Sequence, residues 1–287
     1  MSENTTISSN ELQARLQKAE NIRARDGVVW KDKFDRTHTI SDARELPDGT
    51  PVKLAGRVTA LRWLGKLMFG RIYDIAGEIQ FSMSREELGE EQYKFMKANV
   101  DLGDFIGIDG ELYHTTAGEL TVRVAKYTIL SKALRPLPEK FHGLTDTETR
   151  YRQRYLDIIS NPETRKTLLG RFKMTQYWRE FMNSNGFLEI ETPVMQNVAS
   201  GAAARPFLTH HNALDADFQL RISPELFLKL ANCAGFDRVY EVAKDFRNEG
   251  MDAMHLQEFT MVEWYAAYWD WKRNLKFTWE LIQNLIQ

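Results

Sequence analysis

The sequence predicts a two-domain α+β protein, with a small β-barrel followed by a domain built on an antiparallel sheet. Three observations predict it. A chain of 287 residues has the length of about two domains. Residues 49–134 contain short segments rich in Val, Ile, Phe and Tyr, which are typical of strands. After residue 147, helical and strand patterns follow one another without regular alternation, which favours an α+β arrangement.

The composition is that of an ordinary globular protein. Hydrophobic residues make up 43% and charged residues 27%, so the chain has enough apolar surface to bury a core. No apolar run approaches the roughly 18 residues that span a bilayer, and the polar start MSENTTISSN does not resemble a secretory signal. The single cysteine, Cys233, excludes an intramolecular disulfide and a multi-cysteine zinc site. We therefore expect a cytoplasmic protein without a membrane partner.

Net charge gives no information about partners. The formal charge is −2, so a polyanion would have to be held by local basic patches rather than by the overall field.

Residues 1–48 are predicted to form a helical extension, because Leu12, Leu16 and Ile22 recur at near-helical spacing within 11–26. Residues 49–134 contain five predicted strands, with the helix-forming stretch REELGEEQYKFMKAN between the third and the fourth. Five strands with one helix in that position are typical of the OB-fold, a frequent oligonucleotide binder. The strands are VKLAGRVTALRW, MFGRIYDI, EIQFSMS, DFIGIDGELYHT and LTVRVAKYTIL.

Residues 135–146 are predicted to be a linker, because the segment ALRPLPEKFHGLTDTE contains two prolines and a glycine and shows little periodicity. Residues 147–287 form the second predicted domain. RYRQRYLDII and the run 163–185 are predicted helices, the latter ending at Gly186. FLEIETPVM is a predicted strand closed by Pro193. Two further strands, 236–250 and 258–269, are joined by a loop and followed by a final helix.

The stretch 245–265 contains the residue types of a nucleotide site. If its two halves are strands, Arg247 and Glu249 share a face, and Phe259, Met261, Glu263 and Tyr265 also share one. An arginine binds phosphate oxygens and stabilises charge that develops on them, a carboxylate accepts a hydrogen bond from an exocyclic amine, and an aromatic ring stacks on a base. For any one of these residues alone, a surface ion pair or a core position is the better interpretation.

Together, these residues carry a resemblance to a known family. FRNEG followed by EFTMVEWY resembles motif 2 of the class II aminoacyl-tRNA synthetases, and the helix 163–185 followed by FLEIETPVM resembles motif 1, in the correct order. An OB-fold before the catalytic domain resembles the aspartyl, asparaginyl and lysyl subgroup. Within it, YRQRYLDII, GAAARPF, THHNALD and LRISPELFLK look like the lysyl enzymes.

This resemblance implies ATP-dependent activation of lysine to lysyl-adenylate and transfer to tRNA(Lys). Lysine carries two ammonium groups that need oxygen acceptors, which agrees with an acidic pocket. For Glu225 alone, the first turn of a helix after Ser-Pro is the competing interpretation. By resemblance, the catalytic residue is Arg247, the ATP-binding residues are Arg247, Glu249, His255 and Phe259, and the lysine-binding residues are Gly201, Glu225, Glu263 and Tyr265.

In the OB-fold, Arg57, Phe69 and Gln80 match the family positions that bind the anticodon. A ring can stack on an unpaired base while Arg and Gln bond to its edges. The alternative is that Phe69 fills the barrel, but Arg71 and Tyr73 on the same strand face favour an open surface. Adjacent His210 and His211 point to opposite faces of a strand, so we predict no metal site there.

The sequence also departs from the family. Nothing in it resembles motif 3, so the catalytic domain looks truncated, and the magnesium ligands that accompany ATP are expected in the missing C-terminal part. We expect weak or absent aminoacylation by this chain alone, because a phosphate arginine and metal ligands each contribute several kcal/mol. The motif 2 loop MDAMHLQEF is atypical, and VASGAAARPF has one glycine, Gly201, where a Gly-Gly pair is common in the family.

The expected partners are tRNA(Lys), lysine and ATP, with a homodimer formed through motif 1 when the protein is complete. Two alternatives stay open, namely a non-catalytic fragment that binds tRNA at the anticodon and an aspartyl- or asparaginyl-specific relative. An open sheet edge and exposed apolar surface predict poor solubility or association of the isolated chain.

Overall fold

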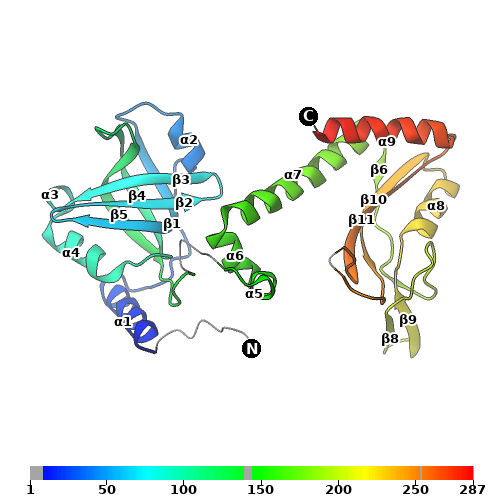
Figure 1. The fold of residues 1–287 in the computed structure, drawn as a ribbon, viewed down its shortest axis with the longest axis horizontal. Helices are drawn as coiled ribbons and strands as arrows, with labels where there is room; N and C mark the ends of the chain where they lie inside the picture. Colours follow the sequence, from blue (N-terminus) through cyan, green and yellow to red (C-terminus); the bar gives the residue numbers. More distant parts are fainter. Residues whose placement is uncertain (1–8, 139–143, 253, 287) are drawn as a thin grey trace. The chain divides into compact units, whose positions relative to one another are not determined.

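A computed structural model describes residues 9–138, 144–252 and 254–286. The chain divides into two compact units, Met1–Pro162 and Glu163–Gln287, which are described separately below (Figure 1). Among the described residues, no helix is both long enough and apolar enough to cross a membrane.

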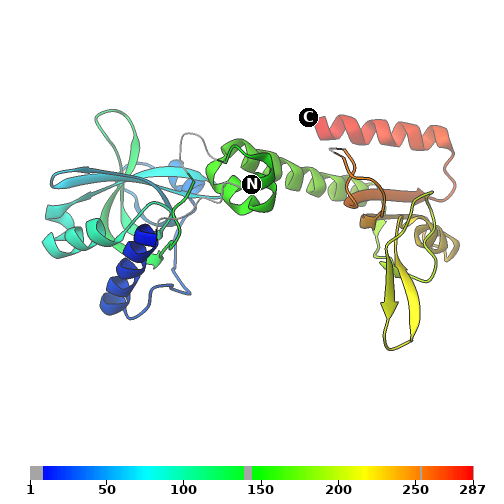
Figure 2. The same cartoon turned by 60° about the horizontal axis from the view of Figure 1, so that its bottom comes forward.

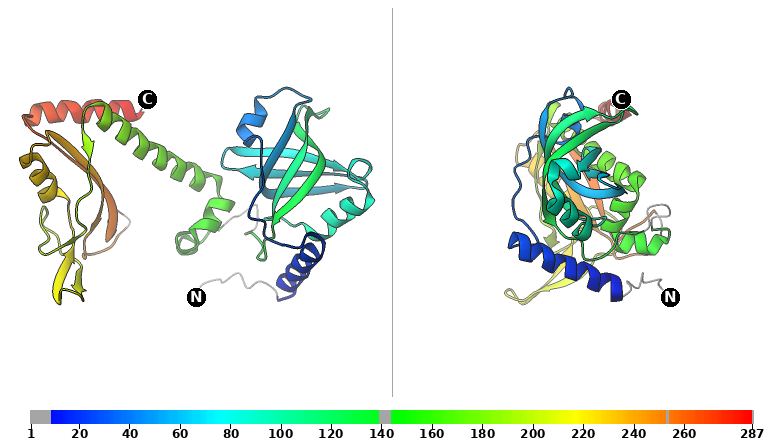
Figure 3. Two further views of the ribbon diagram at one scale, coloured as in Figure 1. Left: turned by 180° about the vertical axis from the view of Figure 1, so that it is seen from behind. Right: turned by 90° about the vertical axis from the view of Figure 1, so that its left-hand side faces the viewer.

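The first unit contains a closed five-stranded barrel with the strand order β1-β2-β3-β5-β4, which confirms the predicted OB-fold (Figures 1 and 3). Alternate side chains of each strand fill its interior, among them Leu54, Ile72 and Phe81, which are fully buried. Helices α3 (Arg85–Leu88) and α4 (Glu90–Asn99) occupy the predicted position between the third and fourth strands. The strands are β1 (Pro51–Leu64), β2 (Leu67–Asp74), β3 (Gly77–Ser84), β4 (Phe105–His114) and β5 (Leu120–Ser131).

Two helices precede the barrel, α1 (Ser9–Asp26) and α2 (Ile40–Arg44). Ile22 of α1 is buried as predicted, but the expected apolar position Leu16 is 37% exposed, and Arg15 is buried instead. The guanidinium of Arg15 donates to the carbonyl oxygen of Ala133 at 3.0 Å. A long side chain can bury its stem in this way while its charge is satisfied by a backbone oxygen, which apolar periodicity alone does not predict.

Helices α5 (Thr147–Arg152) and α6 (Arg154–Ser160) correspond to the predicted helical stretch RYRQRYLDII, interrupted at Gln153. The buried carboxylate of Asp157 holds them together, because it accepts from Arg150 at 2.9 Å and from Arg154 at 2.7 Å. Residues 139–143 of the predicted linker lie outside the described residues.

The second unit is built on a three-stranded sheet with the order β11-β10-β6. Strands β10 (Arg238–Phe246) and β11 (Glu258–Ala266) are antiparallel, and β6 (Leu188–Glu189) lies parallel to β10. A second sheet contains β7 (Met195–Gln196), β9 (Ala216–Leu220) and β8 (Leu208–His211). The predicted α+β class is confirmed.

The predicted strand FLEIETPVM is mostly irregular, which is a correction. It supplies only β6 and the first residue of β7. Its ladder to β10 ends where the amide of Ile190 donates to the carbonyl oxygen of Tyr240 at 2.9 Å. Beyond it, the backbone carbonyl and the hydroxyl of Thr192 accept from the guanidinium of Arg221 at 3.0 and 2.9 Å. A buried side chain therefore satisfies backbone that a neighbouring strand would otherwise bond.

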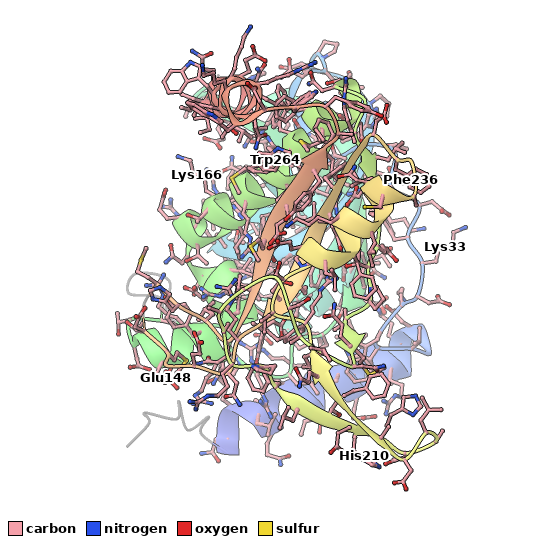
Figure 4. All side chains as sticks on the ribbon, turned by 90° about the vertical axis from the view of Figure 1, so that its right-hand side faces the viewer. Lys33, Glu148, Lys166, His210, Phe236 and Trp264 are labelled. Carbon is pink, nitrogen blue, oxygen red and sulfur yellow. The ribbon has the colours of Figure 1, made fainter. Side chains whose placement is uncertain are left out.

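Helices cover the two faces of the main sheet differently. The ends of α7 (Pro162–Ser184) and α9 (Trp271–Ile286) pack on one face, where Phe277 stacks on Phe187 with ring centroids 5.2 Å apart. Trp264 of β11 lies under α9 in Figure 4, and its indole donates to Asn274 at 2.9 Å. Helix α8 (Glu225–Cys233) borders the opposite face (Figures 1 and 2).

Candidate active site

The face of the main sheet opposite α7 and α9 presents the polar residues that the strand pattern predicts. In the β10–β11 register, Glu241 lies opposite Glu263 and Asp245 lies opposite Phe259. Because side chains alternate along each strand, Phe259, Met261, Glu263 and Tyr265 share this face, as predicted. The site is therefore based on two regular strands that are joined by nine consecutive residue pairs.

Arg247 lies one residue beyond the end of β10. Its backbone amide donates to the carbonyl oxygen of Gln257 at 2.9 Å, which continues the hairpin ladder into the loop. The guanidinium lies 5.2 Å from the centre of the Phe259 ring and donates to the carbonyl oxygen of Ile222 at 3.4 Å. The structure thus brings Arg247 and Phe259 together, with the cation over the aromatic face.

Strand β10 ends at Phe246, so neither Arg247 nor Glu249 lies in a strand, which corrects the prediction that the two residues share a strand face. Glu249 lies in the loop after β10, and its carboxylate accepts from the backbone amide of Arg205 at 3.1 Å. A strand alternation cannot predict this position, because the partner is 44 residues away in the sequence.

His255 makes its side-chain contact within the loop that joins β10 and β11. Its side chain is 74% exposed, and its Nδ1 lies 2.8 Å from a carboxylate oxygen of Asp252. The backbone amide of Met254 and the His255 side chain lower the pKa of Asp252 by hydrogen bonding to the carboxylate. Within the described residues, His255 therefore belongs to a small loop cluster of its own.

The four predicted lysine-binding residues meet around Ser223, which sequence reasoning missed. The Ser223 hydroxyl donates to Oε1 of Glu263 at 2.9 Å and accepts from the Glu225 amide at 3.1 Å. The Tyr265 hydroxyl donates to Oε2 of Glu263 at 3.3 Å. We call Gly201, Ser223, Glu225, Glu263 and Tyr265 the Ser223 cluster.

Gly201 joins the cluster by close backbone approach. A Cβ atom there would lie 2.8 Å from both the Ser223 hydroxyl and the Glu225 Cβ, and the backbone has φ +89°, which favours glycine. The signal in the sequence is the SP dipeptide before Glu225. This dipeptide directly precedes α8, and the Ser223 hydroxyl connects the start of that helix to Glu263 of β11.

The electrostatics of the cluster are acidic. Burial, together with the neighbouring carboxylates of Glu263 and Glu225, raises the pKa of Tyr265 above its ordinary value, so its hydroxyl stays a donor. Glu225 pairs with Lys229 of the same helix, and the Lys229 ammonium lies 5.7 Å from the centre of the Tyr265 ring. Carboxylates at this position suit a ligand with ammonium groups.

Three buried charges lie beside the cluster and were not singled out from the sequence. Arg221 is 3% exposed and donates to Oε1 of Glu241 at 2.7 Å. Asp245 is 0% exposed, and burial raises its pKa to about 6. The sequence signal for the two carboxylates is their even spacing, because Glu241 and Asp245 lie four residues apart on the strand that leads to Arg247 and so share a face.

No residue is assigned to magnesium. Within the described parts of the chain, no group of three or more His, Cys, Asp or Glu side chains is arranged to hold a metal ion. The Glu241 carboxylate is paired with Arg221, whereas Glu263 accepts from the neutral hydroxyls of Ser223 and Tyr265. On the β8–β9 hairpin, His210 bonds to Asp217 at 2.9 Å; Figure 4 labels it near the end of that hairpin.

In the first unit, the predicted anticodon residues lie along the outer face of the barrel. Phe69 pairs with Ser82 across β2 and β3, and Gln80 lies two residues from Ser82, so Phe69 and Gln80 are diagonal neighbours. Gln80 donates to the Thr121 hydroxyl at 2.9 Å. Met68 and Ile72, not Phe69, fill the barrel.

Arg57 is further along the same barrel surface. It pairs with Tyr73, four residues from Phe69, and its guanidinium lies 4.3 Å from the centre of the Phe105 ring. Burial lowers the pKa of the Arg57 guanidinium from its usual value. The three residues therefore form a strip rather than one contact cluster.

A second aromatic residue near Phe69 was missed. Tyr113 of β4 donates to the Ser82 hydroxyl at 3.0 Å, and the Arg123 guanidinium lies 4.6 Å from its ring centre.

The comparisons with known proteins agree with this division. Residues 52–130 match the family model described as the OB-fold nucleic acid binding domain. Residues 146–287 match the model described as tRNA synthetases class II (D, K and N).

The chain is similar to curated proteins named lysine–tRNA ligase. It is 51% identical to that of Aquifex aeolicus over 91% of this chain and 44% of the relative. It is 48% identical to that of Carboxydothermus hydrogenoformans over 97% of this chain and 58% of the relative. The Escherichia coli protein is 45% identical over 97% of this chain and 57% of the relative. The chain thus spans about half the length of these curated relatives.

Proposed function

The chain belongs to the class II aminoacyl-tRNA synthetases, in the family of the lysine–tRNA ligases, and from this premise we propose that it serves ATP-dependent lysylation of tRNA(Lys). The observation that carries the proposal is the pairing, on one sheet face, of the acidic Ser223 cluster with the Arg247–Phe259 pair. One group suits an amino acid with two ammonium groups, and the other suits a nucleotide.

Lysine is the amino acid that the charges favour. Glu225 and Glu263 provide carboxylates for its two ammonium groups, while the backbone at Gly201 and the Tyr265 hydroxyl limit the space around them. Tyr265 also orients Glu263 by donating to it. A substrate with an acidic side chain would bring a second negative charge towards these carboxylates, which disfavours aspartate.

ATP is the proposed second substrate, with Mg²⁺ as the ion that this family uses in general. A carboxylate oxygen of lysine attacks the α-phosphorus, and the bond to pyrophosphate breaks. The terminal ribose hydroxyl of tRNA(Lys) then attacks the lysyl carbonyl carbon, and AMP leaves. The chain's own contribution is positioning and charge stabilisation. Arg247 would stabilise charge on the α-phosphate, and Phe259 would stack on adenine.

Glu249 and His255 are proposed as further ATP contacts, for the adenine amine and a phosphate respectively. Both side chains would have to turn from their present partners, Arg205 and Asp252. A loop that closes on its ligand in this way is common in enzymes.

The barrel is proposed to read the anticodon through Arg57, Phe69 and Gln80, with Phe69 as the stacking platform. The proposed domains are a helical extension (1–48), an anticodon-binding barrel (49–134), a linker (135–146) and a synthetase domain (147–287). The further proposed features are a homodimer formed through motif 1 and a cytoplasmic location, where such a reaction would meet its tRNA.

The test is lysine-dependent exchange of pyrophosphate into ATP by this chain, with aspartate and asparagine as controls. Because this chain alone is expected to be weakly active or inactive, we expect any exchange to be weak and to depend on lysine only. Arg247→Ala should lower it by at least about 100-fold, because a lost charge-stabilising donor costs that much. The exposed Arg273→Ala in α9 is the matched control. Exchange with aspartate or asparagine instead would overturn the lysine assignment.

A folded sample without exchange would favour a second candidate, a non-catalytic tRNA-binding fragment. The observation in its favour is that the chain spans about half the length of its curated relatives. The Arg57→Ala/Phe69→Ala variant should then bind tRNA(Lys) roughly 5- to 150-fold more weakly, since stacking contributes about 1–3 kcal/mol per base. A tRNA with another anticodon is the control, and equal binding of both tRNAs by the unaltered chain would contradict anticodon reading.

A further inference from the structure

Asp245 is a buried carboxylate without a hydrogen-bond donor. It is 0% exposed, and neither of its oxygens has a hydrogen-bond partner among the described residues. Its nearest cation is the Nε of Arg221, at 3.4 Å. Buried carboxylates are normally paired or hydrogen-bonded, because desolvating an unpaired charge is costly. Packing therefore does not explain why a carboxylate occupies this buried position.

The neighbouring cation is already used. The Arg221 guanidinium donates to the carbonyl oxygens of Lys244 and Thr192 at 2.8 and 3.0 Å, and to Glu241 at 2.7 Å. The second oxygen of Glu241 accepts from the Thr192 hydroxyl at 2.6 Å. The charge of Arg221 is therefore balanced by Glu241, and the carboxylate of Asp245 has no cation of its own among the described residues.

The groups that face Asp245 come from three elements. Arg221 follows β9, Glu241 and Arg247 belong to β10 and its end, and Glu263 belongs to β11. Burial raises the pKa of Asp245 to about 6; Glu263 and Glu241 add to this rise, while Arg221 and Arg247 oppose it. Near neutral pH, the charge on Asp245 is thus sensitive to any further cation on this face.

We propose that Asp245 is a positioning residue that adjusts the charge of the amino-acid site, losing its proton to solvent when a cationic amino acid occupies the Ser223 cluster. The inference rests on the proposed function. Asp245 acts through the field and not by contact, because its oxygens are buried. An added ammonium group stabilises the carboxylate, so the O–H bond breaks and the proton passes to the buffer. An amino acid without net positive charge gives no such stabilisation.

The experiment is a calorimetric titration of this chain with lysine near pH 6, in two buffers of different ionisation enthalpy. The difference in observed heat gives the protons released per lysine bound. We expect release of a few tenths of a proton, and lysine affinity that rises up to about tenfold from pH 5 to pH 7, since tenfold corresponds to a shift of one in pKa.

The Asp245→Asn variant keeps the volume of the side chain and removes the titration. It should bind lysine with no proton release and a nearly flat pH dependence. The exposed Asp237→Asn is the matched control and should behave like the unaltered chain. Glu225 and Glu263 are retained in both variants, so their titration cannot explain a difference between them.

Equal proton release by Asp245→Asn and the unaltered chain would overturn the inference and leave lysine binding, hence the proposed function, in place. If Asp245→Asn does not fold, the unaltered chain decides alone, because a flat affinity between pH 5 and pH 7 overturns the inference. Failure of the unaltered chain to bind lysine at any pH would overturn the proposed function and this inference with it.

Discussion

Ser223 shows how one small side chain organises a charged site. Its hydroxyl contacts the carboxylate of Glu263 and the amide that begins α8, so it fixes a strand residue relative to a helix start. Glu263 is also held by Tyr265 from the other oxygen. A carboxylate held by neutral donors keeps its negative charge available to a ligand, whereas one held by an arginine does not.

Asp245 should lower the stability of the folded chain when it ionises. Its pKa is about 6 when folded, against an ordinary value of 3.8, so between these pH values the folded state holds a proton that the unfolded state has lost. The free energy of unfolding therefore falls as pH rises from about 4 to about 6, by at most about 3 kcal/mol, and then levels off. The free energy of unfolding of Asp245→Asn, measured with urea, should not show this fall. At pH 8 it should therefore be larger than that of the unaltered chain.

Asp237→Asn controls for a general change in net charge. If the difference in unfolding free energy between Asp245→Asn and the unaltered chain were the same at pH 4 and pH 8, ionisation of Asp245 would not be its cause.

At the scale of elements, a side chain supplies the hydrogen bonds that a neighbouring strand would otherwise make, because Arg221 donates to Thr192. The backbone after β6 is bonded by a buried guanidinium, and the Thr192 hydroxyl both accepts from Arg221 and donates to Glu241. Thr192→Val keeps the shape and removes both bonds. We expect the second unit to lose about 1–3 kcal/mol in unfolding free energy, the cost of leaving buried polar groups unsatisfied.

Chemical denaturation followed by tryptophan fluorescence measures this loss, since Trp264 and Trp269 pack against the core of the second unit and Trp178 contacts Trp264. Thr209→Val on the exposed strand β8 is the control. A loss no larger than that of the control would mean that the arginine bridge contributes little.

The same element explains what the sequence could and could not predict. Period-two alternation correctly gives the five barrel strands and the shared face of Phe259, Glu263 and Tyr265, because these depend on local pattern and burial. FLEIETPVM also has a strand-like composition, but it is bonded by Arg221, a distant residue. Glu249 and His255 likewise depend on loop partners, which no periodicity specifies.

At the scale of the whole molecule, two cores are built from separate parts of the chain. One lies in the barrel unit and includes Phe81, and the other includes Phe277 and uses only residues of the second unit. Phe81→Ala should lower the stability of the barrel by about 3–5 kcal/mol and leave the second unit unchanged, with the reverse for Phe277→Ala. Calorimetry should resolve two unfolding transitions. Lysine should raise the midpoint temperature of the second unit's transition and leave that of the barrel unchanged.

A single transition that both variants shift equally would contradict this expectation. The lysine-induced shift serves as the internal control, because the ligand is proposed to bind within the second unit alone.

The uninterrupted register of β10 and β11 also limits how this protein can vary over evolutionary time. Nine consecutive pairs join the strands, and one inserted residue would turn Glu241, Asp245 or Glu263 to the opposite, apolar face. Length changes are therefore tolerable in the connecting loop, residues 247–257, while the strands admit only replacements. Related proteins that bind different substrates should therefore differ in the length of this loop and in the side chains on the polar face of β10 and β11. The spacing between the acidic residues of each strand should stay the same.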